Sequence, residues 1–331
     1  MISGSIVLAG QLLGTAFACG LNLYATVALL GIASRSGLAT LPPGMTGLEN
    51  GIVIGSAAAL YVVEFIVDRV PVADHVWEAV HTIIRPAAAA LLTVLALQNS
   101  PLYLQLTGAA AAGAMALAAH GGKAGLRLIV STRSSEARRR SFARTALSLL
   151  EDIGAVALVV AALLYPHIAV GITAASAVLM LLAGPRLWRA AILGLRAVVA
   201  RTRGFFGARG WRSASDLPAG IRNRIPDAPL GRSPARVAAV AVTGLPHVGA
   251  YRNGWLVLTC DGPRFLYRSL FRTHLAVLPG ISGIRLRHGL VTDVLDIDAA
   301  PNGKRSTRSF SIFLLKDGPG PHVTSAELTA N

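Results

Sequence analysis

Residues 103–130 read YLQLTGAAAAGAMALAAHGGKAGLRLIV, and this stretch decides the class of the protein. A helix needs about 20 mostly apolar residues to cross the hydrocarbon core of a bilayer. This stretch is long enough, and its ionisable residues, His120, Lys123 and Arg127, all lie in its second half. It therefore predicts a transmembrane helix with its charges near one end.

Further apolar stretches flank this segment on both sides. Because 53% of the residues are hydrophobic, more than the share typical of soluble proteins, we expect an all-α polytopic membrane bundle. Residues 6–33 have no basic start and exceed the length of a signal-peptide core, so they predict a retained first helix. Pro86 is tolerable as a first-turn residue, so the third span is predicted to be either a broken helix or one that begins at the interface. About six transmembrane helices are predicted, at 6–33, 51–70, 79–98, 103–130, 145–164 and 167–184.

Arginines indicate the orientation of this bundle. Five of them crowd the connection between the fourth and fifth spans, so the positive-inside rule places that connection in the cytoplasm. With six spans, both termini are then cytoplasmic, in a multi-pass protein of the bacterial cytoplasmic (plasma) membrane. Three spans on each side of Asn99 would permit a 3+3 inverted repeat. The five arginines are Arg133, Arg138, Arg139, Arg140 and Arg144.

Ionisable residues within spans are rare and costly, so each is a functional candidate. With this orientation they all fall in the cytoplasmic half of the bundle. Bases and carboxylates at one depth predict either a charge-paired interior or a water-filled vestibule open to the cytoplasm. The candidates for binding an ion or solute are Glu64, Asp68, His81, Arg85, His120, Lys123, Arg127, Glu151 and Asp152.

Each candidate also has a purely structural interpretation. The carboxylates and long bases could form interior ion pairs, and the histidines could hold helices together by hydrogen bonds. Glu78 and His81 have the spacing of a di-metal ligand pair, but such sites need a second pair, which the sequence lacks. We therefore expect no metal and no cofactor. Because the sequence lacks the common hydrolase, metalloprotease and nucleotide-binding motifs, we expect no enzymatic activity.

The polar residues carry a resemblance to a known family. They form the pattern Glu64-Phe65-x-x-Asp68-Arg69-x-Pro71-x-x-Asp74-x-x-Trp77-Glu78-x-x-His81-Thr82-x-x-Arg85-Pro86, then Ala119-His120-x-x-Lys123-x-x-x-Arg127, then Glu151-Asp152. From about Gly14 to Gly184 the chain resembles an uncharacterised bacterial membrane family, the domain of unknown function 4126. The resemblance implies an all-helical membrane bundle and implies no activity.

The composition changes near residue 185, which predicts a different C-terminal part. Residues 186–203 separate arginines from apolar residues on a helical wheel, as in an interfacial helix that meets anionic headgroups. The alternative is a simple continuation of the sixth span. Residues 204–236 predict a linker, 237–318 a small antiparallel β domain of about six strands, and 319–331 a disordered tail. The headgroup-binding residues would be Arg186, Arg189, Arg196 and Arg203.

These patterns leave several functions open. A net charge of +15 beside a membrane bundle favours lipid over nucleic acid as the partner. The leading hypothesis is a secondary-transporter-like bundle that binds a proton or small ion together with a polar solute. The alternative is a non-transporting scaffold whose β domain regulates or binds a partner. A membrane enzyme using Glu64 and His120 ranks third, and the sequence predicts no oligomeric state.

Cys19 and Cys260 are expected to remain unpaired.

Overall fold

The computed structural model describes residues 2–68, 70, 73–133, 137–207, 210–217, 221, 236–259, 262–269, 272–289, 292–299 and 308–329. Cys260 and most of the predicted linker lie outside these residues. The chain divides into two compact units, Met1–Ala191 and Ile192–Asn331, and each is described by itself.

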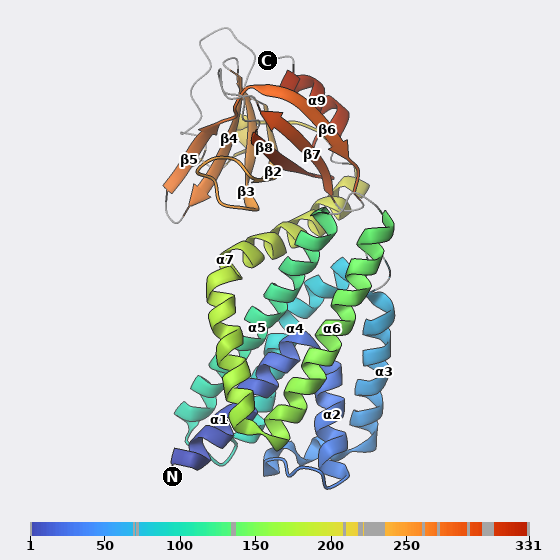
Figure 1. Ribbon diagram of the computed structural model, residues 1–331, viewed down its shortest axis with the longest axis vertical. Coiled ribbons are helices and arrows are strands. Elements are labelled where there is room, and N and C mark those ends of the chain that lie inside the picture. The colour runs from blue at the N-terminus through green and yellow to red at the C-terminus, as the bar shows by residue number, and fades with distance from the viewer. Residues whose placement is uncertain are drawn as a thin grey trace. The chain divides into compact units, whose positions relative to one another are not determined.

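The N-terminal unit is built from helices (Figure 1). Four of them are long and apolar enough to cross a membrane, and η1 with α3 would make a fifth span, bent by 67°. These helices support the predicted polytopic membrane protein, but they confirm neither the count of six spans nor the inverted repeat. The elements are α1 (Ile2–Leu21), α2 (Leu23–Arg35), η1 (Pro43–Glu49), α3 (Gly51–Val67), α4 (Ala73–Ala96), α5 (Leu102–Arg133), α6 (Ala137–Leu164) and α7 (Pro166–Phe205).

Apolar side chains cover the outside of these helices, and charged side chains lie within. Ile52 and Leu181 are each 78% exposed, whereas Arg85 is completely buried. Exposing this much apolar surface to water would be unfavourable, and large exposed apolar surfaces are accordingly rare on soluble monomers. A bilayer removes that penalty, and the distribution supports a membrane location.

The predicted first span, residues 6–33, is wrong. The chain reverses at Asn22, so that α1 and α2 form a helical hairpin rather than one crossing helix (Figure 1). A continuous helix would place Leu30 about 20 Å beyond Ala16. Instead, Leu12 and Ala16 of α1 line the same small cavity as Leu30 of α2 and Leu92 of α4.

Local chemistry explains this reversal. Asn22 has extended backbone angles, with φ −147° and ψ 101°, and caps α2 by accepting a hydrogen bond from the Ala25 amide at 3.0 Å. Asparagine is among the preferred N-cap residues because its side chain satisfies an amide that the helix leaves free. At Gly20, a β-carbon would lie 2.4 Å from the Ala116 carbonyl oxygen of α5. Only glycine permits this close approach of the two backbones.

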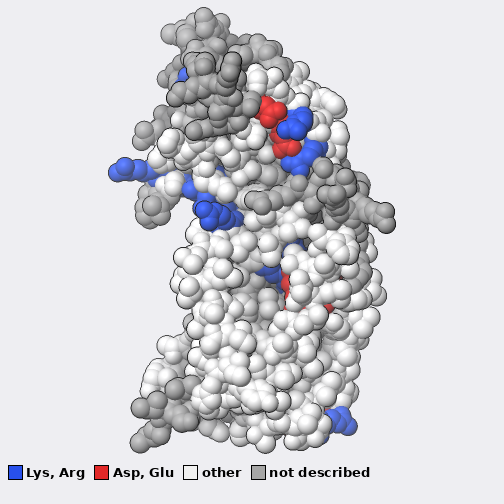
Figure 2. Space-filling model, in the orientation of Figure 1, with Lys and Arg blue, Asp and Glu red and all other residues white. Residues whose placement is uncertain are grey.

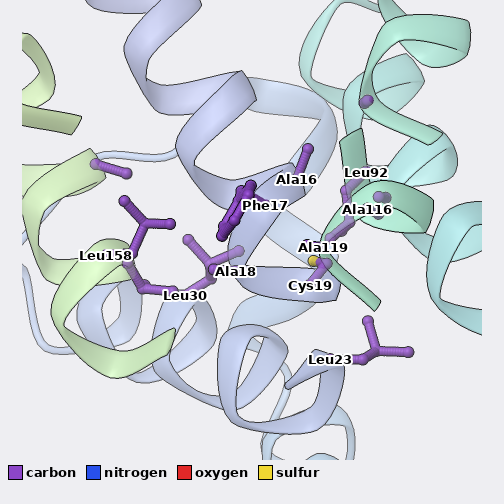
Figure 3. Close-up of a cluster of buried hydrophobic side chains, with 14 of the residues drawn as sticks. Ala16, Phe17, Ala18, Cys19, Leu23, Leu30, Leu92, Ala116, Ala119 and Leu158 are labelled. Carbon is purple, nitrogen blue, oxygen red and sulfur yellow. The ribbon is translucent and has the colours of Figure 1, made fainter. Parts of the chain in front are cut away.

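The hairpin packs into the centre of the bundle. Its tip region supplies the fully buried Ala18 and Cys19, and Figure 3 shows Cys19 beside Ala119 of α5. The side chains around it are mostly small, which lets the helix backbones approach closely. Cys19 is unpaired, as predicted. The cluster also includes Phe17, Leu23, Leu30, Leu92, Ala116 and Leu158.

The hairpin also changes the expected position of the N-terminus. Gly10 lies so near the start of α7 that a β-carbon there would stand 2.3 Å from the Pro166 carbonyl oxygen. At Gly44 of η1, a β-carbon would stand 2.1 Å from the Leu95 carbonyl oxygen, near the end of α4. The beginning of α1 therefore lies at the same end of the bundle as the connections after α4 and α6. If the α5–α6 connection is cytoplasmic, the N-terminus is outside, contrary to our expectation.

We expect an N-terminal epitope tag and cysteines replacing Ser36 or Ser100 to report the same side of the membrane. The reason is that a hairpin returns the chain to the side from which it entered. Accessibility to an antibody and to an impermeant thiol reagent in intact cells measures this, in a background with Cys19→Ala and Cys260→Ser. An N-terminal tag on the opposite side from Ser36 would show that the first segment crosses the membrane.

Two prolines lie inside helices where we expected them at helix boundaries. Pro86 lies within α4, which runs unbroken from Ala73 to Ala96, so the third span is not broken at Pro86 and does not begin there. Pro185 lies within α7, which continues to Phe205. The predicted interfacial segment, residues 186–203, is therefore helical, but it continues the last span without a break. Flanking helical turns compensate for the one hydrogen bond that each proline removes.

The C-terminal unit contains an eight-stranded antiparallel sheet (Figure 1). Its order is β5-β4-β3-β2-β8-β7-β6, with β1 paired to β2. Only residues 278–280 join β5 to β6, which lie at opposite ends of this order. Three residues span at most about 14 Å, so the sheet must curl until its edges approach each other. The strands are β1 (Arg212–Ser213), β2 (Arg236–Thr243), β3 (Arg252–Thr259), β4 (Gly262–Ser269), β5 (Arg272–Val277), β6 (Ile281–Arg287), β7 (Thr292–Ala299) and β8 (Arg308–Leu315).

The end of the chain differs from our prediction of a disordered tail. Residues 321–329 form helix α9 (Pro321–Thr329), whose Leu328 is 3% exposed and joins the core of the sheet. Its Thr324 is fully buried and donates a hydrogen bond to the Gly320 carbonyl at 3.0 Å. The few apolar residues of this short segment, Val323, Ala326 and Leu328, gave no periodic signal, and tertiary packing orders it.

Candidate functional site: a buried charge network at the hairpin tip

Four helices bring the ionisable residues of the N-terminal unit together. His120, Lys123 and Arg127 occupy one face of α5, because residues three, four and seven apart on a helix share a face. Glu64 and Asp68 come from the end of α3, and Glu151 and Asp152 from α6. We call these side chains, together with Glu78, His81 and Arg85 of α4, the charge network.

Arg85 fixes the tip of the hairpin. Its Nη1 donates to the backbone carbonyls of Gly20 at 2.9 Å and Leu21 at 3.0 Å, and its Nη2 donates to Glu64 Oε1. The carbonyls at the end of α1 lack helical partners and carry the negative end of the helix dipole. A buried guanidinium satisfies both the free carbonyls and the carboxylate.

Lys123 supports the same tip from α5. Its Nζ donates to the Leu21 carbonyl at 3.0 Å and lies 3.4 Å from Glu64 Oε1. Glu78 and Glu151 approach the same ammonium at 3.7 Å and 3.5 Å. The α1–α2 reversal is therefore held by two cations, neither of which lies on the hairpin itself.

Arg127 joins three carboxylates from three helices. It binds Asp68 through two parallel hydrogen bonds, of 2.9 Å from Nη1 and 2.7 Å from Nη2. Its Nη1 also donates to Glu78 at 3.0 Å, and its Nη2 to Glu151 at 2.5 Å. Paired donation to one carboxylate is the strongest geometry available to arginine. Arg127 is thus the centre through which α3, α4 and α6 are connected.

The hydrogen bonds of His120 assign its tautomer. Its Nε2 lies 3.0 Å from the Glu78 backbone oxygen, which can only accept, so Nε2 carries a proton. Its Nδ1 lies 3.0 Å from Arg85 Nη1, which can only donate, so Nδ1 accepts. The ring is neutral by this assignment. Yet Nδ1 also lies 3.3 Å from Glu78 Oε2, an oxygen without a hydrogen-bond partner.

Two further contacts extend the charge network along the hairpin. The Nε2 of His81 accepts a hydrogen bond from the Tyr24 hydroxyl at 2.9 Å, and its Nδ1 donates one to the Trp77 carbonyl at 2.8 Å. The His81 ring also stacks on the Trp77 ring. Asn22 donates from its side chain to Asp152 at 2.9 Å. The residue that reverses the hairpin is therefore itself bound to the charge network.

The charges of the charge network do not balance. Its five carboxylates are Glu64, Asp68, Glu78, Glu151 and Asp152, and its permanent cations are Arg85, Lys123 and Arg127. If all were ionised, two negative charges would remain uncompensated among these described residues. Within the part of the chain that the structure describes, two carboxylate oxygens also lack a hydrogen-bond partner, Glu64 Oε2 and Glu78 Oε2. Burying an unpaired charge is very costly, so the charge network has room for two more positive charges.

The side chains of the charge network pair directly with one another. Of our two predictions for this depth, these contacts are those of a charge-paired interior. The edge around Arg127 and Glu78 is the more open part, with 11% and 10% of these side chains exposed. Figure 2 shows a small group of red and blue atoms within the mostly white face of the helical unit.

All nine predicted ion- or solute-binding residues lie in this network, and several of their partners among the described residues escaped prediction. Glu78 was treated only as a half of a metal pair, because the third span was expected to begin at residue 79. Asn22, Tyr24 and Ser148 were overlooked as polar residues within apolar runs. The predicted headgroup residues, Arg186, Arg189, Arg196 and Arg203, all lie on α7, outside the network.

Comparison with known proteins identifies a family but no activity. Residues 9–186 match the family described as a domain of unknown function, DUF4126. The match covers more than half of the chain, so the protein belongs to this family, as the resemblance in its polar pattern predicted. No curated protein and no solved structure matches the chain.

Proposed function

We propose that the helical unit is a secondary-transporter-like membrane protein whose charge network exchanges protons, together with a polar solute. The observation that supports this best is the charge imbalance, five carboxylates facing three permanent cations in a buried site. A buried network with excess negative charge binds protons or a small cation when it is available. Such binding is the first requirement of an ion-coupled transporter.

The geometry suggests where one proton is bound. Glu78 Oε2 and His120 Nδ1 lie 3.3 Å apart, and both are acceptors when Glu78 is ionised and His120 is neutral. A proton between them would give Glu78 Oε2 the hydrogen-bond partner that it lacks among the described residues. Lys123 and Arg127 face the other oxygen, Glu78 Oε1, and Arg85 faces His120. The proton therefore belongs to a coupled network rather than to one residue.

The hairpin supports a transport role. Irregular backbone at membrane depth is tolerated only where protein buries it or where it lines a cavity. In secondary transporters, broken helices present carbonyl groups and helix ends to ions near the middle of the bilayer. In this chain, the Gly20 and Leu21 carbonyls meet Arg85 and Lys123 at such a break. Releasing a proton from the network would alter the charges that hold the hairpin tip.

A non-transporting scaffold is the second candidate. It is favoured by Arg127, whose contacts with Asp68, Glu78 and Glu151 tie three helices together without any ligand. In that case the C-terminal β unit would regulate or bind a partner. In both proposals the α5–α6 connection faces the cytoplasm of a bacterial cell, anionic lipids contact the arginines of α7, and the chain has no enzymatic activity.

Replacing Glu78 with Gln tests the shared proton. We expect Glu78→Gln to keep the wild-type melting temperature at acidic pH and to weaken its pH dependence. In the wild type, the folded state binds a proton that is lost as pH rises, so stability is fully present at low pH and declines toward alkaline pH. The amide of Gln donates permanently in place of that proton. Thermal unfolding of detergent-purified protein across pH measures this.

Glu49→Gln is the matched control, because Glu49 lies outside the charge network and accepts a hydrogen bond from Ser34 at 2.6 Å. It should leave the pH profile of the wild type unchanged. If Glu78→Gln instead lowers stability by several kcal/mol at every pH, then Glu78 is the ionised partner of Arg127 and no proton is shared.

A further inference from the structure

The C-terminal unit contains a cavity of about 490 Å³ that no known property of the chain explains. It lies between the last turns of α7 and the strands β2 and β3, all of which belong to this unit. Cavities of about 300 to 1,000 Å³ are the size that binds small molecules. The proton exchange proposed above plays no part in this site.

The cavity carries excess positive charge. Arg196 and Arg203 reach it from α7, and Arg212 reaches it from β1. The one carboxylate in the lining, Asp317, receives a hydrogen bond from Arg212 at 3.0 Å and also interacts electrostatically with Arg196. Within the described part of the chain, no hydrogen bond or ion pair engages the guanidinium of Arg203, whose backbone carbonyl accepts from the Phe206 amide. Three guanidinium groups thus share a single counter-ion.

The remaining wall of the cavity is mostly apolar. Leu195 and Val199 line it from α7, Val237 from β2 and Leu315 from β8. Trp255 of β3 adds a large aromatic side chain. Guanidinium groups beside an apolar wall suit a ligand with an anionic end and an apolar or planar part. Arginine matches the geometry of phosphate oxygens through paired hydrogen bonds.

We propose that this cavity binds an organic phosphate, with the phosphate on Arg196 and Arg203 and the apolar or planar part against Trp255 and Leu195. Two sources offer this chemistry. One is the headgroup of an anionic lipid such as phosphatidic acid, and the other is a soluble phosphate ester such as a nucleoside monophosphate. Both place a phosphate next to a less polar group, so the structure assigns the ligand class and the experiment assigns the source.

The test uses the full chain in phosphatidylcholine nanodiscs, in two arms. In the soluble arm, AMP and inorganic phosphate are titrated calorimetrically. In the lipid arm, phosphatidic acid replaces part of the phosphatidylcholine, and lipids retained by the protein are counted by native mass spectrometry. We expect one organic phosphate to bind at one site, with roughly tenfold weaker binding in Arg203→Gln, since a charge-assisted hydrogen bond is lost.

Two further variants separate a cavity from general attraction between charges. Ala239 lines the cavity, so Ala239→Phe fills it without changing any charge and should abolish binding. Arg272 on β5 does not line it, so Arg272→Gln should bind like the wild type although it removes the same charge. Unchanged melting temperatures would show that each variant is folded.

Retention of phosphatidic acid alone identifies a lipid, and binding of AMP alone identifies a soluble ester. Absence of saturable binding in both arms overturns the proposal. Wild-type affinity in Ala239→Phe overturns it as well, because binding would then not need the cavity. Equal affinity for inorganic phosphate and the organic phosphates would contradict the role given to Trp255 and the apolar wall.

Discussion

Replacing Arg127 with Met is expected to lower the free energy of unfolding of the helical unit by roughly 3–5 kcal/mol, the cost of breaking a buried ion pair. Arg127 contacts Asp68, Glu78 and Glu151, and the charge network already has more carboxylates than cations. Removing this guanidinium increases the excess of buried negative charge. It also removes one of the two cations that join α3, α4 and α6, so the effect should exceed that of most core substitutions.

Two comparisons make this result interpretable. Arg127→Lys keeps the charge but loses the paired hydrogen bonds to Asp68, so it should lie between the wild type and Arg127→Met. Arg35→Met removes an exposed arginine from the end of α2 and should change stability by less than about 0.5 kcal/mol. Denaturant unfolding in detergent measures all three. A loss below about 1 kcal/mol in Arg127→Met would show that this ion-pair centre does not hold the helices together.

Hydropathy predicted the helices that cross the bundle because their apolar length is a strong local signal. It could not predict the hairpin, since the apolar run at residues 6–33 has the composition of a span whichever way the chain turns. The information lies in Gly20 and Asn22, where a glycine permits close approach and an asparagine caps a new helix. Neighbouring glycine and asparagine within an apolar run are therefore a signal for a break.

The charge network was predictable in part for the same kind of reason. The spacing of His120, Lys123 and Arg127 places them on one face of a helix, and the cost of burying them implies partners at the same depth. The spacing of residues along one helix does not show which residues of other helices they pair with. Glu78 was missed as a partner because α4 begins at Ala73, several residues before the apolar run that defined the predicted span.

In the C-terminal unit, alternating apolar runs predicted most strands, and the structure confirms an antiparallel sheet. Strand β5 was missed because Arg272 and His274 interrupt its apolar pattern, although it pairs with β4 over six positions from Arg264↔Val277 to Ser269↔Arg272. Helix α9 was missed because Leu328 gains its burial only from contact with the sheet. Both elements depend on partners distant in sequence.

The central claim is that the charge network has more carboxylates than cations and can therefore accept protons. Glu64→Gln tests it most directly, because removing this carboxylate still leaves four carboxylates for Arg85, Lys123 and Arg127. We expect Glu64→Gln to fold with near wild-type stability at neutral pH and to show a weaker pH dependence. Lys123→Met should lower stability by several kcal/mol, since it leaves five carboxylates for two cations.

The deciding measurement is the thermal stability of wild type, Glu64→Gln, Lys123→Met and the double variant across pH. Our account predicts a stable Glu64→Gln variant, an unstable Lys123→Met variant and only partial recovery in the double variant. In a scaffold with one-to-one ion pairs, Glu64→Gln leaves buried cations unpaired and Lys123→Met restores the balance. Strong destabilisation by Glu64→Gln alone, with full rescue in the double variant, would contradict the proton-binding account and leave the scaffold.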